Sequence, residues 1–313
     1  MDKILKFIWG INNLNIMAKS TIITIGSFDG MHKGHQCLID NVVLLSQKKK
    51  LPSMVIIFEP QPKEYFSKNS TNSRIMTLRD KLIFLKKKKI DYILCIRFNL
   101  KFLKKSPEDF VNEILIQKMK CRYLIVGRDF QFGFKRKGNI DFLKKLKNFT
   151  IKIVKTQYIN KKRISSSWLR ECLLNSKFNL ASKLLGRNYI ITGKIFHGIK
   201  LGRKLGFPTI NINLSKKMVL SGIYYVQVQG IKKYKKIQGI ASIGNRPMIK
   251  NNDLLLEVYL LDFKDQCYGK LVSVIFLQKI RDEKKFVSFK SMIHQMHIDL
   301  KYANYLKNFY IDI

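Results

Sequence analysis

Two histidines follow a short apolar run and several glycines near the start of the chain. The run, TIITIG at 21–26, predicts a strand, and the residues from Gln36 to about Gln47 have helical spacing. His32 and His35 therefore stand at the turn between a predicted strand and a predicted helix. Backbone N–H groups and the positive end of the helix converge at such a turn, and anions bind there.

The residue types in this turn favour a phosphate over a metal. Gly26, Gly30 and Gly34 lack the Cβ atoms that would hold a phosphate away, while the two imidazoles add movable donors. A zinc site needs at least three protein ligands, and the two histidines alone do not make one. The alternative is a tight turn with two surface histidines. The joint arrangement favours phosphate binding.

The charge balance is strongly basic, with 60 Lys and Arg against 21 Asp and Glu and a net charge of +39. Nucleic acids attract such proteins through their phosphates. We nevertheless predict no specific nucleic-acid partner, because the 48 Lys outnumber the 12 Arg, whereas phosphate and base readers favour Arg forks. Runs such as KKKK at 86–89 are typical of solvated helix ends.

The sequence contains no candidate for membrane insertion or export. No apolar stretch reaches the roughly 18 residues that span a bilayer, and the N-terminus lacks a long apolar region and a small-residue cleavage site. We therefore expect a cytoplasmic protein with no membrane partner, and we leave its oligomeric state open. The cysteines form no CxxC pair and are expected to be buried thiols; they are Cys37, Cys95, Cys121, Cys172 and Cys267.

Apolar runs alternate with helical periodicity from residue 21 to about 155. Start signals for helices stand between them, namely Thr77 with Asp80, and Ser106 before Pro107. This alternation predicts a doubly wound, Rossmann-like parallel sheet, in which ligands bind beyond the carboxyl ends of the strands. The strands after TIITIG are SMVIIF (53–58), YILCIRF (92–98) and YLIVG (123–127).

The pattern changes after about residue 186 to crowded, alternating segments, which predict an antiparallel barrel or sandwich. A helical stretch from about Glu283 to Leu306 is expected to pack against it. We place the boundary near Gly186, which gives domains at 1–185 and 186–313. The predicted strand segments are 189–196, 222–230, 237–242, 254–263 and 270–276.

Several motifs resemble one bacterial enzyme family, the bifunctional riboflavin kinase/FAD synthetases. GSFDGMHKGH (26–35) is similar to the signature of flavin adenylyltransferases, within the wider HxGH nucleotidyltransferases. Further motifs similar to the family are FEPQP (58–62), VGRDFQFG (126–133), RISSSWLR (163–170), LGRNYIITGKIFHGIKLGRKLGFPTINI (185–212), GIASIGNRP (239–247), LLEVYLLDF (255–263) and FLQKIRDEKKF (276–286). The resemblance runs from about residue 20 to 300 and implies two activities: ATP-dependent phosphorylation of riboflavin to FMN, and adenylylation of FMN to FAD with release of pyrophosphate.

The resemblance implies an adenylyltransferase site in the first half. His32 and His35 would contact the ATP phosphates as catalytic residues. Arg163 and Arg170 would hold pyrophosphate, and Ser165 or Ser166 would cap a helix. The remaining ATP-side residues are Gly26, Phe28, Asp29, Gly30 and Gly34. The flavin-side residues are Phe58, Pro60, Asp129 and Phe130, although Phe130 and Phe132 could equally belong to the core.

The resemblance implies a riboflavin kinase site in the second half. Glu257, the only acid within LLLEVYLL, would take the proton of the ribityl 5′-hydroxyl, unless it is an outward-facing strand residue. Thr209 and Asn211 of FPTIN would help to hold Mg²⁺, and Arg281 would contact the flavin. The ATP loop would consist of Gly198, Gly202, Arg203, Gly206 and Pro208.

Some positions depart from the family pattern. Ser27 stands for Asn, Ser167 for Thr, Ile210 for the Ala of PTAN, and Met248 for a Thr. Ile210 is harmless only if it points into the barrel core. The alternatives are another HxGH nucleotidyltransferase, a basic nucleic-acid-binding protein, and a chain that retains only one of the two activities.

Overall fold

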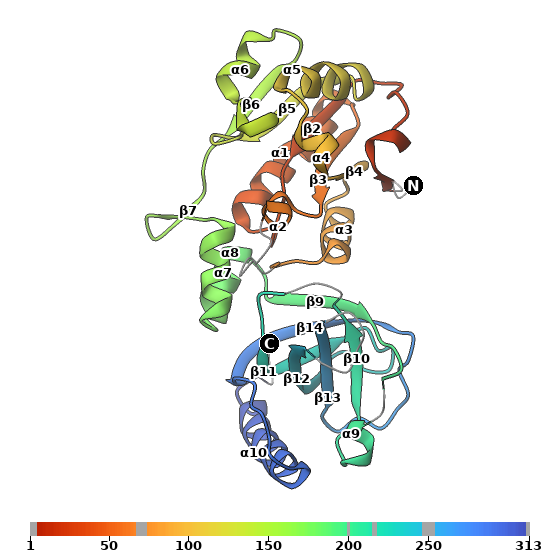
Figure 1. Ribbon diagram of the computed structural model, residues 1–313, viewed down its shortest axis with the longest axis vertical. Coiled ribbons are helices and arrows are strands. Elements are labelled where there is room, and N and C mark those ends of the chain that lie inside the picture. The colour runs from red at the N-terminus through yellow and green to blue at the C-terminus, as the bar shows by residue number, and fades with distance from the viewer. Residues whose placement is uncertain (1–4, 67–73, 199–200, 215–217, 246–253, 311–313) are drawn as a thin grey trace. The chain divides into compact units, whose positions relative to one another are not determined.

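The computed structural model describes residues 5–66, 74–198, 201–214, 218–245 and 254–310 (Figure 1). The chain forms two compact units. The first unit comprises Met1–Asn72 with Lys81–Ser165, and the second comprises Ser73–Asp80 with Ser166–Ile313. The second unit thus takes in a short segment from the N-terminal half of the chain.

The first unit contains a six-stranded parallel sheet in the order β1-β4-β3-β2-β5-β6, which confirms the predicted α/β fold. Its strands are β1 (Lys6–Trp9), β2 (Thr21–Ile25), β3 (Ser53–Glu59), β4 (Tyr92–Arg97), β5 (Cys121–Gly127) and β6 (Thr150–Val154). Its helices are η1 (Ile11–Asn13), α1 (Lys33–Lys49), α2 (Pro62–Phe66), α3 (Leu78–Lys87), α4 (Leu100–Leu103), α5 (Pro107–Asp109), η2 (Phe110–Lys118), η3 (Phe134–Arg136) and α6 (Ile140–Lys145). A small hairpin of β7 (Tyr158–Ile159) and β8 (Lys162–Arg163) follows.

Both faces of this sheet are covered. Ile23 and Ile25 of β2 belong to the apolar cluster formed with η2 and α6, so Ile22 points to the other face of the sheet. Helix α1 packs on β2, β3 and β5 and takes no part in that cluster. All five residues of β2 are buried, including Thr21 and Thr24, so this strand does not alternate between buried and exposed side chains.

The order of strands reverses at β2. The chain proceeds from β2 to β3 and β4 on one side, and β5 and β6 lie on the other side. The turn that leaves β2 is therefore at the topological switch point, where doubly wound sheets bind their ligands. His32 and His35 follow that turn.

The second unit contains a six-stranded antiparallel sheet in the order β10-β13-β12-β11-β14-β9. Its elements are α7 (Ser166–Leu174), α8 (Phe178–Leu185), β9 (Tyr189–Lys194), α9 (Leu201–Lys204), β10 (Thr209–Asn213), β11 (Gly222–Gln229), β12 (Ile237–Asn245), β13 (Leu254–Leu260), β14 (Leu271–Arg281) and α10 (Phe289–Lys307). The predicted antiparallel barrel is confirmed, because the two edges of the sheet meet through a bridge from Phe196 to Asn211.

The terminal helix α10 lies against this sheet (Figure 1). It buries Ala303 and Leu306 in a cluster with Tyr225 and Leu277. The helix begins later than the predicted Glu283, because Ser288 and Ser291 form a capping box that fixes its start.

The predicted domain boundary and the compact units differ at α7 and α8. These helices precede residue 186 but cluster with the second unit, where Phe178 meets the ring of Tyr224 at 5.9 Å. The segment Ser73–Asp80 belongs there as well. Tyr189 donates a hydrogen bond to the carbonyl of Ile75 at 2.7 Å, and Thr192 N–H donates to Asp80 at 3.1 Å.

All five cysteines are free, and four of them are buried as predicted. The expectation for Cys37 is wrong. Its position on the partly exposed face of α1 leaves the side chain half-buried, and its Sγ accepts a hydrogen bond from Gln157.

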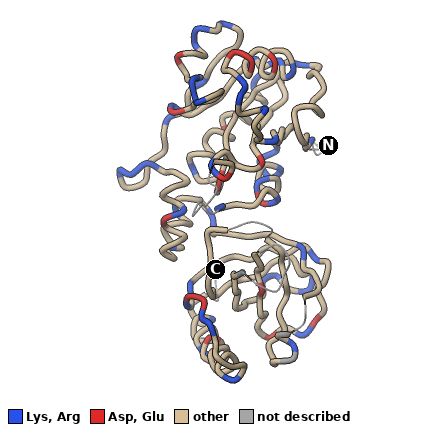
Figure 2. The backbone as a smooth tube through the Cα atoms, viewed as in Figure 1, with Lys and Arg blue, Asp and Glu red and all other residues tan. Residues whose placement is uncertain are grey.

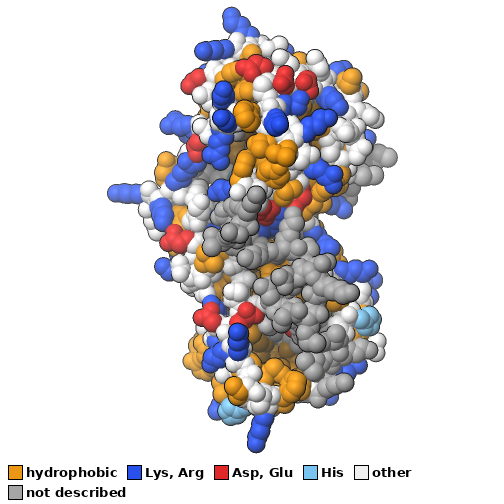
Figure 3. Space-filling model, in the orientation of Figure 1, with side chains coloured by type: hydrophobic (Ala, Val, Ile, Leu, Met, Phe, Trp, Pro, Cys, Tyr) orange, Lys and Arg blue, Asp and Glu red, His pale blue; other side chains and the backbone are white. Residues whose placement is uncertain are grey.

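No helix within the described ranges is both long and apolar enough to cross a membrane. Basic residues are distributed along both units, on helices, strands and loops (Figure 2). On the face shown in Figure 3 they are dispersed among polar and hydrophobic side chains.

Candidate active sites

The turn between β2 and α1 has a strained backbone. Phe28, Gly30 and Met31 have positive φ angles of 47°, 84° and 47°. Phe28 and Met31 are buried non-glycine residues, and such residues adopt this conformation at a free-energy cost. Strain of this kind concentrates at ligand sites, where the surroundings hold the chain in place.

His32 is the N-cap of α1. Its Nδ1 accepts a hydrogen bond from the backbone N–H of His35 at 3.3 Å, so its Nε2 carries the proton and is a donor. The rings of His32 and His35 stack with centroids 3.7 Å apart, and the edge of Phe28 packs on His35 at 5.2 Å. Two imidazoles are thus locked at the positive end of a helix, as an anion site requires.

His35 is held neutral. Burial, followed by the charges of His32 and Lys81, lowers its pKa well below the usual 6.5. Its Nδ1 is buried and has no hydrogen-bond partner in the described structure. A buried nitrogen without a partner is uncommon in folded proteins, and a ligand atom or a water would satisfy it.

Two further polar side chains brace the turn. Asp29 is 4% exposed and accepts a hydrogen bond from Gln61 at 3.3 Å. Lys81 of α3 is fully buried, and its Nζ donates to the carbonyl of Ser27 at 2.7 Å. Neither Gln61 nor Lys81 was identified from the sequence. Lys81 is one of 48 lysines, and only its burial distinguishes it.

The glycines of the turn make room for rings. A Cβ atom on Gly34 would lie 3.2 Å from the His32 imidazole, and one on Gly26 would lie 3.2 Å from the Phe28 ring. From the sequence, these glycines were expected to let a phosphate approach the backbone. The structure adds a second reason, because a larger residue would crowd the ring of Phe28 or of His32.

The predicted flavin-side residues of the first unit lie at the end of β3 and in the segments that follow β3 and β5. Phe58 is half-buried and packs on Phe98 and Phe102. Phe130 stacks on Phe132, which is buried in the core cluster, while Phe130 is partly exposed at its edge. Pro60 follows β3 and is partly exposed. The roles of Phe58, Pro60 and Phe130 stay predictions.

The motif RISSSWLR spans the two units. Arg163 of β8 forms an exposed ion pair with Asp129, which joins one predicted phosphate ligand to one predicted flavin ligand. Ser165 immediately precedes α7 and so occupies the position of a cap, while Ser166 and Arg170 are part of that helix. Contacts of these residues with ATP stay predictions.

The second unit encloses a cavity of about 220 Å³. Four predicted site residues line it, namely Gly202, Thr209, Glu257 and Arg281. The glutamate is only partly exposed on β13. The rest of the wall is mostly apolar, with Ser242 and Asp299 as its further polar residues; the apolar residues are Leu205, Phe207, Ile223, Ile240, Tyr259, Phe286, Met292 and Met296.

Glu257 is on β13, and each of the two neighbouring strands places a polar residue beside it. It is directly opposite Asn211 on β10 and Ser242 on β12. Directly opposed residues of antiparallel strands project from the same face, so Asn211, Glu257 and Ser242 share one face. Asn211 is 7% exposed and donates to the carbonyl of Thr209 at 3.4 Å. Ile210 projects from the opposite face and is buried, so its bulk is directed away from these residues.

Arg281 is fixed by Asp299 of α10. Its Nε and Nη2 donate to the two carboxylate oxygens at 2.7–3.0 Å, and both side chains are largely buried. The guanidinium also lies over the ring of Phe286. The sequence analysis found Arg281 but missed Asp299, although the helical spacing of Phe286, Met292 and Met296 had placed this helix against the barrel.

Two glycines of the predicted ATP loop lie too close to neighbouring groups to carry a Cβ atom. A Cβ on Gly198 would lie 2.7 Å from the Asn211 amide, and one on Gly202 would lie 2.4 Å from the carbonyl of Phe207. Gly206 has φ +83° in the turn that follows α9. Arg203 and Pro208 are exposed. Met248 lies outside the described residues.

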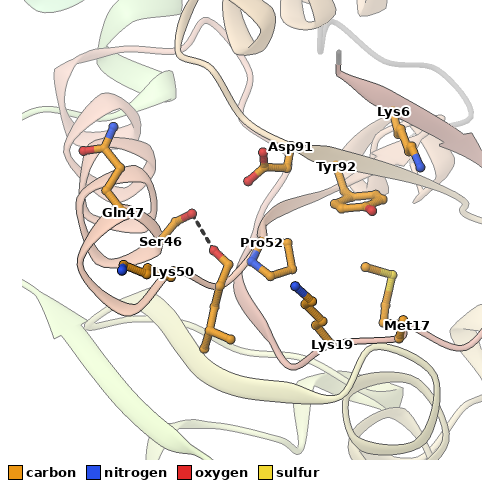
Figure 4. Close-up of a pocket in the computed structure, with 11 residues that line it drawn as sticks. Lys6, Met17, Lys19, Ser46, Gln47, Lys50, Pro52, Asp91 and Tyr92 are labelled. Carbon is orange, nitrogen blue, oxygen red and sulfur yellow. Dashed lines mark hydrogen bonds between the residues drawn. The ribbon is translucent and has the colours of Figure 1, made fainter. Parts of the chain in front are cut away.

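A larger cavity, of about 650 Å³, lies at the amino ends of the parallel strands, opposite the ends that lead to His32 (Figure 4). Lys6 at the start of β1, Lys19 before β2, and Asp91 before β4 line it. The strands begin at this end of the sheet, so the cavity is separate from the turn that carries His32. Cavity size therefore does not identify the candidate site of this unit.

Comparison with known proteins assigns both units. Residues 15–168 match the FAD synthetase family, and residues 185–306 match the riboflavin kinase family. The bifunctional riboflavin kinase/FMN adenylyltransferase of Buchnera aphidicola subsp. Acyrthosiphon pisum is 40% identical, over 97% of this chain and 100% of that protein. The protein of the same name from Escherichia coli K12 is 37% identical, over 94% and 96%. A crystal structure titled macrolide-efflux protein, from Streptococcus pneumoniae, has 28% identity and a TM-score of 0.75, over 95% of this chain and 98% of that one.

The first unit has two imidazoles at the start of a helix, beside a parallel sheet. The second unit has a glutamate in a cavity of an antiparallel sheet. Together these features define a transferase with two modules. The matched ranges agree with that division. The chain belongs to the bifunctional riboflavin kinase/FMN adenylyltransferase family, and it is a transferase of flavin cofactor biosynthesis.

Proposed function

We propose that the cavity of the second unit is where riboflavin is phosphorylated to FMN, and that the turn at His32 and His35 is where FMN is adenylylated to FAD. The observation that carries this assignment is the convergence of Glu257, Thr209 and Arg281 on one cavity. The functional modules keep their predicted limits, 1–185 and 186–313. The matched ranges, 15–168 and 185–306, support those limits.

In the kinase step, Glu257 accepts the proton of the ribityl 5′-hydroxyl of riboflavin. The oxygen then bonds to the γ-phosphorus of ATP, the bond to the bridging oxygen breaks, and ADP leaves. A carboxylate is suited to this role because a hydroxyl is a weak nucleophile at neutral pH. The apolar and aromatic wall, with Arg281 at its edge, would hold the isoalloxazine ring.

The metal ion implied by the family is Mg²⁺. Thr209 and Asn211 offer a hydroxyl and an amide oxygen two residues apart on one strand, and oxygen ligands of this kind fit Mg²⁺. Two such ligands suffice for an ion that takes its remaining ligands from water and phosphates. When bound, Mg²⁺ neutralises charge on the transferred phosphoryl group.

In the adenylyl step, a phosphate oxygen of FMN bonds to the α-phosphorus of ATP, and pyrophosphate leaves with the electron pair. No enzyme nucleophile is needed, so the protein positions the reactants and stabilises charge. His32 donates through Nε2, and neutral His35 lies beside it. Arg163 would hold the leaving pyrophosphate, as would Arg170 on α7.

We also propose that the enzyme acts in the cytoplasm with ATP, riboflavin and FMN as its small-molecule substrates. The free thiols support this compartment. No specific nucleic-acid partner is proposed, because the basic residues are distributed along the whole chain (Figure 2).

A time course with separable variants tests the assignment. The purified protein is incubated with riboflavin, ATP and Mg²⁺, and the flavins are resolved by chromatography. FMN is expected first and FAD later. Glu257→Gln should slow FMN formation by about 10²–10⁴-fold, while FMN supplied from outside is still converted to FAD. His32→Ala should have the opposite effect.

A matched control uses Glu108→Gln, an exposed glutamate in the first unit, which should change neither step. If the wild-type protein makes neither product, the assignment of function fails. If each variant loses both activities, the assignment of one step to each unit fails.

A further inference from the structure

Lys81 is an unusual lysine in a lysine-rich protein. Among the described residues it is the only lysine classed as buried, with none of its surface exposed. Burying an ammonium group costs several kcal/mol unless polar partners compensate, and proteins therefore keep nearly all lysines at the surface. The burial of Lys81 therefore calls for partners that compensate its charge.

The geometry connects this ammonium to the adenylyl-transfer turn. Lys81 projects from α3, and its Nζ donates to the carbonyl of Ser27 at 2.7 Å. Ser27 is the second residue after β2 and precedes Phe28, where the backbone enters its strained conformation. The hydrogen bond therefore fixes the β2 end of the turn that leads to His32 and His35.

The same ammonium acts electrostatically on the imidazole pair. The groups whose charges act on His35 are His32, at the N-cap of its own helix, and Lys81, from α3. Phe28 covers the ring edge of His35, and Asp29 of the same turn is bound by Gln61. Burial first, and then the charges of His32 and Lys81, disfavour protonation of His35, so a neutral imidazole lies near the Lys81 ammonium.

We propose that Lys81 is a positioning residue of the adenylyl-transfer site, which fixes the Ser27 carbonyl and adds a permanent positive charge where the ATP phosphates bind. The proposal rests on the function proposed above for the first unit. A fixed ammonium in a low-dielectric surrounding attracts phosphate charge more strongly than a solvated lysine does. The neutral imidazole beside it keeps an N–H donor without requiring protonation, so phosphate binding persists above neutral pH.

Two substitutions separate charge from structure. Lys81→Gln removes the charge but keeps a side-chain N–H that can donate to the Ser27 carbonyl, whereas Lys81→Arg keeps the charge. Lys86→Gln, on an exposed position of the same helix, is the matched control. A chemical denaturation curve of each full-length variant reports whether the first unit is folded, and its kinase activity reports the second unit, to which Glu257 belongs.

The first measurement is steady-state adenylylation of FMN at varied ATP. Lys81→Gln should raise the KM for ATP about tenfold, as expected for the loss of a charged contact, and leave riboflavin phosphorylation unchanged. Lys81→Arg should restore most of the affinity, and Lys86→Gln should match the wild type. A purely structural lysine would instead be replaced successfully by glutamine.

The second measurement needs no ATP. A ¹H–¹³C NMR titration follows the ring Cε1–H of His35, assigned by its absence in His35→Gln. Lys81→Gln should raise the pKa of His35 toward its usual value, because one of the charges that lower it is gone.

If the folded Lys81→Gln variant keeps the wild-type KM for ATP, or if the titration of His35 is unchanged, the proposal is overturned. That outcome differs from failure of the proposed function, in which the wild-type protein itself makes no FAD.

Discussion

Asn211 on β10 lies directly opposite Glu257 on β13, so a buried amide and the candidate base share one face of the antiparallel sheet. The pairing places the proposed metal-side residue next to the proposed proton acceptor. Asn211→Ala should therefore reduce riboflavin phosphorylation about tenfold or more and increase the Mg²⁺ concentration needed for half-maximal rate. Asn213→Ala, on an exposed position of the same strand, should have little effect. Equal behaviour of the two variants would contradict the assignment.

The ion pair of Arg281 with Asp299 should stabilise the second unit and hold the edge of its cavity. Asp299→Asn leaves a largely buried guanidinium without its carboxylate, which should cost about 3 kcal/mol of unfolding free energy. The KM for riboflavin should increase as Arg281 moves. Chemical denaturation and riboflavin kinetics measure the two effects. Asp262→Asn, which breaks an exposed pair with Lys307, should cost at most about 1 kcal/mol.

Acid should destabilise the first unit through His35. The pKa of His35 in the folded chain lies below its usual 6.5, so the unfolded chain binds a proton first as the pH falls. The unfolding free energy therefore decreases as the pH drops below about 6.5 and is fully retained above it. His35→Gln should flatten this dependence in denaturation curves measured between pH 5 and pH 8. The same substitution at exposed His294 should leave the slope unchanged.

Gly34 should be needed for adenylylation but not for phosphorylation. A Cβ at this position would lie 3.2 Å from the imidazole of His32, which forces the ring to shift. Gly34→Ala should lower the rate of FAD formation from FMN about tenfold, while FMN formation from riboflavin is kept. Gly127→Ala is the control, since a Cβ there meets nothing within 4 Å. A loss of activity in the control as large as in Gly34→Ala would show that the effect is not local.

The sequence predicted the elements that bury continuous apolar runs. TIITI and SMVIIFE form β2 and β3, and Ser106 accepts the hydrogen bond of a helix start, as its position before Pro107 indicated. Five strands gave no such signal, namely β1, β6, β7, β8 and β10. β1 is a four-residue edge strand with mostly exposed side chains, and β10 consists of the motif residues TININ, whose polar members Thr209 and Asn211 were interpreted as ligands.

Site residues were predictable where a motif carried them and unpredictable where only tertiary packing defines them. His32, His35 and Glu257 stand in recognisable patterns, and the structure brings Glu257 together with Thr209 and Arg281. Asp299 was missed because a single acid on a helix has no distinguishing context. Contacts between segments distant in the chain, such as Arg281 with Asp299, leave no local periodicity to detect.

The second unit is built from two separate stretches of polypeptide, and this affects how it can be made. Residues 74–80 bind the side chain of Tyr189 and the backbone of Thr192. They leave the ribosome well before those two residues have been synthesised. These hydrogen bonds of the second unit therefore form only after β9 has been synthesised. A gene split after residue 165 would yield a C-terminal product without the Ile75 carbonyl and the Asp80 carboxylate. Shuffling the two modules as independent cassettes would carry the same deficit.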